Sequence, residues 1–140
     1  MAREIVSDLY WIAECGPDRS GFVGDTEGAP PDWYDPNQEL HIPNCAYLFT
    51  DEQSLLFDTL SPARTDEILE SVDELVEDGL DYLVVSHPDV PHAGNTVPIL
   101  EEYPDCTLVA PEYGEAHELY RLDNSIQVKE GDHLNIGRYT

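Results

Sequence analysis

The sequence predicts an α/β fold in one domain, residues 1–140, with a mixed β-sheet and helices packed against it. Two short apolar runs, "YLVV" at 82–85 and "TLVA" at 107–110, indicate buried strands because they are continuous rather than alternating. A segment with helical features precedes each run, and alternation of strand and helix is typical of α/β folds. A chain of this length is long enough to bury a real core.

The first part of the chain predicts three strands. They lie at residues 4–13 ("EIVSDLYWIA"), 45–50 ("CAYLFT") and 54–60 ("SLLFDTL"). A short acidic turn separates the last two, which predicts a hairpin. Residues 16–44, between the first two strands, are rich in Gly, Pro and Asp and have no periodicity, and so long a loop often forms a lid over a binding site.

A helix is predicted after Ser61, which can cap it, with Pro62 in the first turn and Gly79 as the C-cap. Its apolar stripe consists of Ile68, Leu69, Val72, Leu75, Val76 and Leu80. Further helices are expected at 95–103, capped by Asn95, and at 112–122. Residues 125–140 predict a hairpin that turns at Gly131 and Asp132. The predicted core is Ile5, Leu9, Tyr47, Leu55, Phe57, Ile68, Val72, Leu75, Leu83, Val85, Leu108 and Ile126.

The charge balance is extreme, with 30 acidic residues, one Lys and five Arg, for a net charge of −24. Such a charge repels nucleic acid and anionic membrane surfaces, so we expect neither as a partner. The apolar residues, 41% of the chain, fall in periodic blocks, which favours a folded domain over disorder. An acid excess with almost no Lys is similar to the proteins of salt-loving archaea, and it predicts that the chain loosens at low salt.

The cysteines Cys15, Cys45 and Cys106 are odd in number and form no CxxC pair. This pattern argues against a disulfide framework and a zinc knuckle, and it favours reduced thiols. No long apolar run follows Met1, so neither a signal peptide nor a membrane span is expected. The sequence therefore predicts a cytoplasmic protein.

Three potential metal ligands follow the buried strand at 82–85 directly: His87, Asp89 and His92, with Gly94 behind them. Sites in α/β sheets lie at the carboxyl ends of strands. The H-x-D spacing places His87 and Asp89 on one side of an extended backbone, and the turn through Pro91 can return His92 toward them. Imidazole with carboxylate suits iron, zinc or manganese. The alternative is a polar loop with incidental histidines.

This loop also carries a resemblance to a known family. "VVSHPDVPHAGN" resembles the H-x-H-x-D-H signature of the metallo-β-lactamase fold and is most similar to its flavodiiron branch, H-x-E-x-D-H-x-G. "SLLFDTLSP" resembles the family's strand that ends in an aspartate, here Asp58. The resemblance implies the N-terminal half of an αββα sandwich. It also implies that His87, Asp89 and His92 are metal ligands and that Asp58 orients their loop.

The resemblance implies an oxidoreductase that reduces oxygen or nitric oxide at iron (zinc or manganese being alternatives) with a flavin-containing electron donor. Two departures stand against a complete site: Pro91 replaces the motif's aspartate, and the family's later ligands belong to a second half. His133 is expected at the surface rather than as a ligand. Alternatives are a metal-dependent hydrolase of the same fold and a non-catalytic half-domain. Since half a sandwich leaves apolar faces uncovered, we expect a homo-oligomer or a partner that completes the fold.

Overall fold

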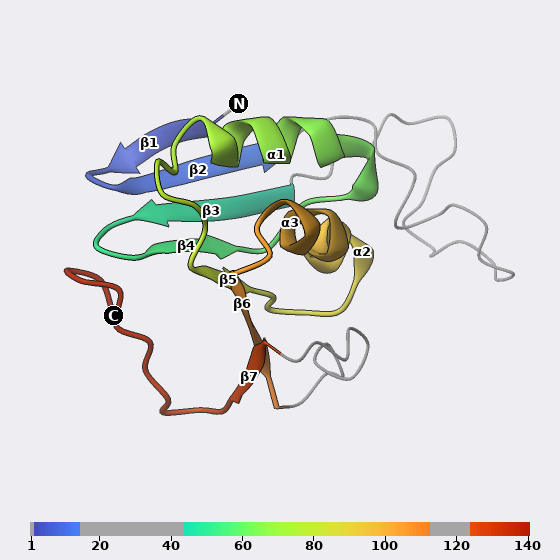
Figure 1. Cartoon of the computed structure of the whole chain (residues 1–140). Helices are drawn as coiled ribbons and strands as arrows, with labels where there is room; N and C mark the ends of the chain where they lie inside the picture. Colours follow the sequence, from blue (N-terminus) through green and yellow to red (C-terminus); the bar gives the residue numbers. More distant parts are fainter. Residues whose placement is uncertain (1, 15–43, 113–123) are drawn as a thin grey trace, which may run out of the picture.

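A seven-stranded mixed sheet organises the computed structural model of the chain, which describes residues 2–14, 44–112 and 124–140 (Figure 1). The elements in order are β1 (Ala2–Val6), β2 (Leu9–Glu14), β3 (Asn44–Thr50), β4 (Ser54–Phe57), the short 3-10 helix η1 (Pro62–Arg64), α1 (Thr65–Asp73), β5 (Tyr82–Val84), α2 (Val90–Ala93), α3 (Thr96–Glu102), β6 (Thr107–Pro111) and β7 (Ser125–Val128). The strands lie side by side in sequence order. Strands β1 to β4 pair antiparallel and β4 to β7 pair parallel, which confirms the predicted α/β class with a mixed sheet.

The single strand predicted at 4–13 is wrong, because these residues form the hairpin β1–β2. The chain turns at Ser7 and Asp8, between the paired residues Val6 and Leu9. Asp8 has a positive φ of 64°, a conformation that Asp tolerates better than most residues. The apolar residues on both sides of the turn hid it, since they continue one strand-like pattern.

The predicted hairpin of the next two strands is confirmed, with pairs that run from Tyr47–Phe57 to Thr50–Ser54. Strands β5, β6 and β7 are each parallel to the strand before them, and the connections from β4 to β5 and from β5 to β6 cross over the sheet. The helix α1 connects β4 to β5, and α2 and α3 connect β5 to β6. The carboxyl ends of β4 and β5 therefore lie side by side at one edge of the sheet, where the candidate ligands follow.

The helix after Ser61 is shorter than the apolar stripe predicted. It begins as η1, continues as α1 and ends at Asp73, with no side-chain cap bond from Ser61. Leu75 and Val76 follow the helix and still pack against the core. Gly79 has a positive φ of 95° but lies in the connection to β5, not at the C-cap. The stripe predicted which residues are buried or half-buried, although the helix ends before its last members.

The predicted hairpin at 125–140 is wrong, because only β7 forms and it lies parallel to β6. A turn closed by Lys129 and Asp132 ends the strand. Residues 133–140 then return to the first hairpins, where Tyr139 donates its backbone N–H to Asp51 Oδ2 at 3.0 Å and Arg138 pairs with Asp8 at 2.6 Å (Figure 1). Bonds to distant turns replace the strand pairing expected here. The predicted loop at 16–44 and helix at 112–122 lie almost entirely outside the described residues.

The core fills the space between one face of the sheet and the helices. Alternate strand residues point into it and meet Ile68 and Val72 of α1 and Ile99 of α3. The predicted core residues that are buried are Leu55, Ile68, Val72, Leu83, Val85 and Leu108. Leu9, Tyr47 and Leu75 are half-buried. Three predictions are wrong, since Ile5, Phe57 and Ile126 are 48%, 37% and 41% exposed.

Two of these errors, Phe57 and Ile126, share one cause, which is the face of the sheet on which the residues lie. Phe57 pairs with Val84, and Ile126 pairs with Val109, on the face opposite the helices. We call this face, defined by Phe57, Val84, Val109 and Ile126, the open face. Ile5 is exposed for a different reason, since it lies on the edge strand β1, where the register shifts. Beside the open face, the C-terminal segment borders a hollow of about 400 Å³ lined by Phe49, Leu55, Phe57, Val84, Val109, Val128, Lys129, Asp132, His133, Leu134, Ile136, Tyr139 and Thr140.

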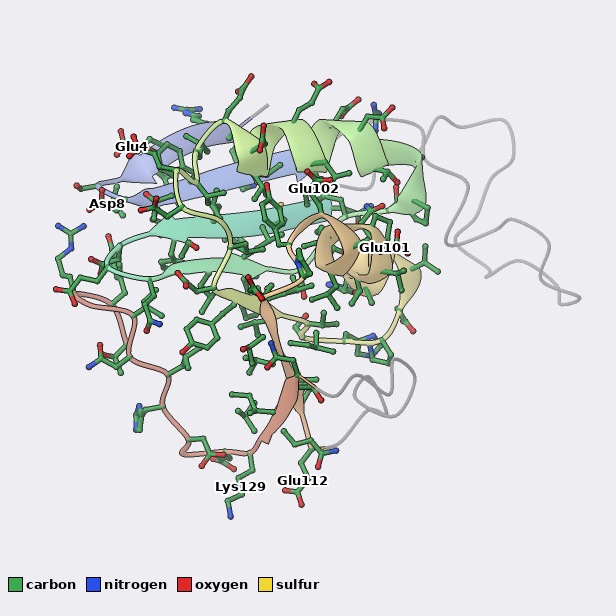
Figure 2. The ribbon with its side chains drawn as sticks, in the orientation of Figure 1. Glu4, Asp8, Glu101, Glu102, Glu112 and Lys129 are labelled. Atoms are coloured by element: carbon green, nitrogen blue, oxygen red, sulfur yellow. The ribbon has the colours of Figure 1, made fainter. Side chains whose placement is uncertain are left out.

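Charged side chains cover the outside of the fold. Figure 2 shows Glu101 and Glu102 extending from α3, and Glu112 and Lys129 extending from the ends of the neighbouring strands β6 and β7. Both glutamates of α3 are exposed, as is Lys129. Among the helices that the structure describes, none has the length and apolar character needed to cross a membrane.

Candidate metal site

The candidate site lies where β4 and β5 end. Residues 58–61 follow β4, and residues 85–89 follow β5 and lead into the four-residue helix α2. The two segments meet first through the backbone, because Asp58 donates its N–H to Val84 O at 2.8 Å. Parallel pairing of β4 with β5 thus places the segment that carries Asp58 against the segment that carries the histidines.

Asp58 holds the imidazole of His92. Its Oδ2 lies 2.9 Å from His92 Nδ1, and the Asp58 side chain is 6% exposed whereas that of His92 is 44% exposed. A carboxylate only accepts hydrogen bonds, so the contact requires the hydrogen on Nδ1. The other ring nitrogen, Nε2, is then the one with a lone pair available to a ligand. This is the arrangement expected of a carboxylate that orients a metal-binding histidine.

Ser86 anchors the same carboxylate with two further hydrogen bonds. Its backbone N–H donates to Asp58 Oδ1 at 2.8 Å, and its hydroxyl donates to Asp58 Oδ2 at 2.7 Å. Together with His92 these donors give Asp58 three bonds, which offset the cost of burying a carboxylate. Asp58 has a positive φ of 64° and Leu60 of 61°, conformations that are rare outside glycine. Such strain persists only where the surroundings hold the backbone firmly.

Thr59 and Asn95 connect the two segments through the backbone. Thr59 donates both its N–H and its hydroxyl to the carbonyl of His92, at 2.8 and 2.9 Å. Asn95 was predicted as a helix cap and does stand at the N-cap of α3, but its side chain makes no cap bond. Instead its amide donates to the carbonyls of Thr59 at 2.7 Å and Ser61 at 2.8 Å. The prediction named the right position and the wrong bond, because the acceptors come from a distant part of the chain.

Gly94 allows the segments to approach this closely. A Cβ there would lie 2.6 Å from Pro62 Cδ and from Val90 O, and 2.9 Å from Leu60 O. Two of these atoms belong to the backbone and cannot move aside cheaply. Any other residue at this position would push α2 away from residues 58–62.

His87 and Asp89 are more exposed than His92. Their side chains are 56% and 70% exposed, and His87 Nδ1 lies 3.3 Å from Asp89 Oδ2. The rings of His87 and His92 lie next to each other, with centroids 5.8 Å apart and planes at 66°. Within residues 2–14, 44–112 and 124–140, no three His, Cys, Asp or Glu side chains form a group that could hold a metal ion as they stand. The structure therefore brings the imidazoles together and leaves Asp89 turned toward His87.

The donor types fit a divalent ion even so. Two imidazoles and a carboxylate occur within one short segment, and the outward nitrogen of His92 is oriented by Asp58. Asp89 is exposed enough to change rotamer at little cost. The three-ligand site of His87, Asp89 and His92 stays a prediction. His133 lies among the exposed residues, on the border of the hollow at the open face.

Sequence reasoning missed Ser86 and Thr59, and it misread Asn95. All are uncharged, and their importance comes from bonds to the backbone or carboxylate of a segment about 30 residues away, as in the Asn95–Thr59 pair with a separation of 36. The one local signal was position, since Thr59 follows Asp58, Ser86 precedes His87 and Asn95 follows Gly94.

Comparison with known families identifies the fold. The model of the metallo-beta-lactamase superfamily matches residues 38–137, which include Asp58 and the whole ligand segment. The chain belongs to the metallo-beta-lactamase superfamily. The resemblance drawn from "VVSHPDVPHAGN" is thereby confirmed at the level of the superfamily.

The chain is similar in sequence to parts of longer proteins. The chain is 33% identical over 98 residues to a nitric oxide reductase of Moorella thermoacetica, a match that covers 66% of this chain and 25% of that protein. It is 28% identical over 145 residues to an uncharacterized protein of Methanocaldococcus jannaschii, covering 100% of this chain and 34% of that protein. The chain thus spans about a third or less of the length of these relatives.

Solved structures show the same fold. The rubredoxin oxygen:oxidoreductase of Desulfovibrio gigas superposes with a TM-score of 0.76 at 24% identity, over 99% of this chain and 33% of that one. The flavodiiron protein of Giardia intestinalis superposes with a TM-score of 0.74 at 18% identity, over 99% of this chain and 32% of that one. The α/β fold of this chain is therefore that of the metallo-β-lactamase-like domain in flavodiiron proteins, of which the chain covers a part.

Proposed function

We propose that the chain binds a divalent metal ion through His87, Asp89 and His92 and provides the N-terminal half of a metal centre of the diiron oxidoreductase type. The observation that carries this proposal is the bond between Asp58 Oδ2 and His92 Nδ1, 2.9 Å long, at the carboxyl end of the parallel strands. A buried carboxylate that fixes one ring nitrogen leaves the other to face outward, next to a second imidazole.

Iron is the metal we favour, with zinc and manganese as alternatives. A carboxylate in place of a further histidine adds an oxygen donor, and oxygen donors shift preference toward iron or manganese. When bound, iron would supply one-electron chemistry to the site. The chain's own part is to hold the imidazoles, through Asp58 and Ser86, and to offer the carboxylate of Asp89.

Relatives support the class of reaction. The names of two of them describe a nitric oxide reductase and a rubredoxin oxygen:oxidoreductase. We therefore propose that the complete protein reduces nitric oxide or oxygen and receives its electrons from a flavin-containing partner or domain.

The three candidate ligands His87, Asp89 and His92 do not by themselves complete such a centre. Pro91 stands where the motif of the diiron branch has an aspartate, and a proline side chain cannot bind metal. Catalytic sites commonly use three protein ligands and solvent for one metal, and a coupled pair needs more. We propose that a further polypeptide segment, in the same chain or in a partner, supplies the others and covers the open face. The apolar residues Phe57 and Ile126, exposed there, support this proposal.

A cytoplasmic location suits this chemistry. Cys45 and Cys106 are both unpaired thiols, as expected in a reducing compartment. The acid excess of the chain favours a cytoplasm of high salt, as in salt-loving archaea.

Metal analysis tests the proposed function. The chain is purified from a culture replete in iron and zinc, and then reconstituted with Fe²⁺, Zn²⁺ or Mn²⁺ without oxygen. We expect about one equivalent of weakly bound ion, because structural and catalytic sites need at least three well-placed ligands and these three are the only candidates at the loop. His87→Ala should abolish binding and His133→Ala should leave it intact. Two equivalents of iron per chain would show that the site is complete without a partner.

A negative result has an equally definite meaning. If no ion binds after reconstitution, the chain is a half-domain that keeps the fold and has lost the chemistry. Pro91 is the feature of the sequence that favours this second candidate function.

A further inference from the structure

One residue of the ligand segment, His92, is held at two places by two consecutive residues. Asp58 contacts its ring nitrogen Nδ1, and Thr59 donates two hydrogen bonds to its carbonyl, from its N–H at 2.8 Å and from its hydroxyl at 2.9 Å. The ring contact alone leaves the backbone of His92 able to shift. The carbonyl contacts alone leave the ring able to rotate. Within the ligand segment the N–H of His92 also donates to Asp89 O at 2.9 Å. The contacts with Asp58 and Thr59 together set the direction in which Nε2 points relative to the neighbouring segment.

Asn95 extends this arrangement and uses all of its hydrogen-bonding groups in doing so. Its side chain is buried, with 0% of the residue exposed. The amide donates to Thr59 O and Ser61 O, the Oδ1 accepts from Thr65 Oγ1 at 2.6 Å, and the backbone N–H donates to Thr59 Oγ1 at 2.9 Å. Thr59 Oγ1 thus receives a bond from Asn95 and donates one to His92. A single hydroxyl joins His92 of α2 to Asn95 at the start of α3.

The orientation of Asn95 argues for more than general stability. At the N-cap of α3 the ordinary role of an Asn side chain is to accept from the helix's first N–H groups, and here that bond is not made. The side chain turns instead to the carbonyls of residues 59 and 61, in the segment where Leu60 has a positive φ of 61°. The N-terminus of α3 therefore lacks a side-chain cap from Asn95. The same side chain instead fixes the segment that carries Asp58 and Thr59 in position next to His92.

We infer that Thr59 and Asn95 are positioning residues that fix the backbone of His92 and so aim its outward imidazole nitrogen before any metal binds. Calling that nitrogen a ligand rests on the proposed function, but the positioning itself does not, and it can be measured in metal-free protein. The clamp, meaning Thr59 with Asn95, would make the ligand loop pre-organised rather than shaped by the ion. Outer contacts of this kind commonly change metal affinity by about 10- to 100-fold.

The first measurement uses the metal-free chain. Long-range nitrogen–proton correlation spectra at pH 8 report which ring nitrogen of His92 carries the hydrogen. We expect a single form, with hydrogen on Nδ1, in the unsubstituted chain and in Thr59→Ser, which keeps the hydroxyl. Thr59→Val keeps the shape and removes the hydroxyl, and it should give a mixture of the two tautomers. Asn95→Ala should do the same.

The control is Ser54→Ala. Ser54 is buried to a similar degree, and its hydroxyl donates to Gly79 O at 2.9 Å, in a part of the fold that does not contact the ligand segment. This variant loses a buried hydroxyl as Thr59→Val does, yet it should keep the single tautomer of His92. A mixture in Ser54→Ala as well would mean that any loss of stability releases the ring, and it would overturn the inference.

The second measurement is zinc affinity by competition with a chromogenic chelator. We expect Thr59→Val and Asn95→Ala to bind zinc about 10-fold more weakly or worse, while Thr59→Ser and Ser54→Ala stay within about 2-fold of the unsubstituted chain. If no form of the chain binds zinc, the proposed function fails and the tautomer measurement still decides the inference. If Thr59→Val does not fold, the spectrum of the unsubstituted chain still tests the inference. Mixed tautomers of His92 in that chain would overturn the inference that Thr59 and Asn95 fix the ring. Unchanged tautomers in folded Thr59→Val and Asn95→Ala would do so too.

Discussion

Asp58 Oδ2 accepts from Ser86 Oγ at 2.7 Å and contacts His92 Nδ1 at 2.9 Å, so a single buried oxygen joins the residue before His87 to His92. Replacement of Asp58 by Asn removes the charge and turns one acceptor oxygen into a donor. We expect the affinity for zinc or iron to fall about 10- to 100-fold, because His92 loses its orientation. The unfolding free energy should fall by about 1–3 kcal/mol, since buried donors lose their acceptor.

Chelator competition and urea unfolding measure the two effects. Asp105→Asn is the control. Asp105 is exposed and lies before the amino end of β6, whereas the candidate site lies at the carboxyl ends of β4 and β5. An Asp58→Asn chain with unchanged affinity would show that Asp58 stabilises the fold and does not orient His92.

The two faces of the sheet should differ in what they contribute to stability. Leu83 points into the core and is 0% exposed, whereas Ile126 lies on the open face and is 41% exposed. Leu83→Ala should lower the unfolding free energy by about 2–5 kcal/mol, the usual cost of such a change in a packed core. Ile126→Ala should cost clearly less in the same urea titration at high salt. Equal costs for the two variants would contradict the assignment of the faces.

The central strands β4, β5 and β6 could be predicted from the sequence because their apolar runs are continuous. For the same reason the sequence does not show which face of these strands packs against the helices. Leu55, Leu56 and Phe57 are all apolar, and only the position of the helices shows that Leu56 points into the core and Phe57 does not. The turn at Ser7 and Asp8 was missed because apolar residues continue on both sides of it.

The candidate site divides in a similar way. Asp58, His87, Asp89 and His92 could be named as candidates from the sequence because their residue types are those of metal chemistry and their spacing matches a motif. The structure brings Asp58 to His92, and the three-ligand site stays a prediction. Thr59 and Asn95 could not be named in this way, since their bonds to carbonyls exist only after α1 has brought β4 and β5 together. A sequence motif identifies side chains that can bind a metal. The backbone hydrogen bonds that orient those side chains can be identified only from the folded structure.

The open face should make the isolated chain associate. Phe57 and Ile126 expose apolar side chains there, and a sheet normally buries such a face against another layer. We expect sedimentation velocity in molar KCl to show a dimer or a larger species. Ile126→Lys should weaken the association. Val97→Lys should not, because Val97, 48% exposed, lies on α3 at the helical side. A stable, well-folded monomer at high concentration would refute this prediction.

Stability should fall as the pH rises above about 9, in part through Cys106. Burial raises the pKa of the Cys106 thiol from 9.0 to about 12. Between these values the unfolded chain releases a proton that the folded chain keeps, so the unfolded state gains and the unfolding free energy decreases with pH. The contribution is fully present below pH 9 and is lost toward pH 12, with a slope of at most about 1.4 kcal/mol per pH unit.

Urea unfolding of the unsubstituted chain and of Cys106→Ala, at several pH values from 8 to 10, isolates this effect. Tyr103, whose pKa burial raises to about 12 from an ordinary value of 10.0, adds a similar loss at higher pH, so the comparison stops at 10. The slope should be shallower in Cys106→Ala. Parallel slopes would mean that the thiol is not buried from water in the folded chain.

Low salt should lower the stability of the fold, because the chain has a large negative charge and several of its carboxylates lie close together. A hollow of about 330 Å³ beside the end of α1 is bordered by Asp51, Glu52, Glu77, Asp78 and Asp81, and the chain carries a net charge of −24. Salt at about 1 M screens charges beyond about 3 Å, whereas at 0.1 M the screening length is about 10 Å and these carboxylates repel one another. The midpoint of thermal unfolding should therefore rise steeply with KCl.

Glu77→Lys should reduce the dependence of this midpoint on KCl more than Glu130→Lys does. The second variant changes the net charge equally, but Glu130 lies in the turn after β7. Equal effects of the two variants would mean that total charge, and not the acidic hollow, sets the response to salt.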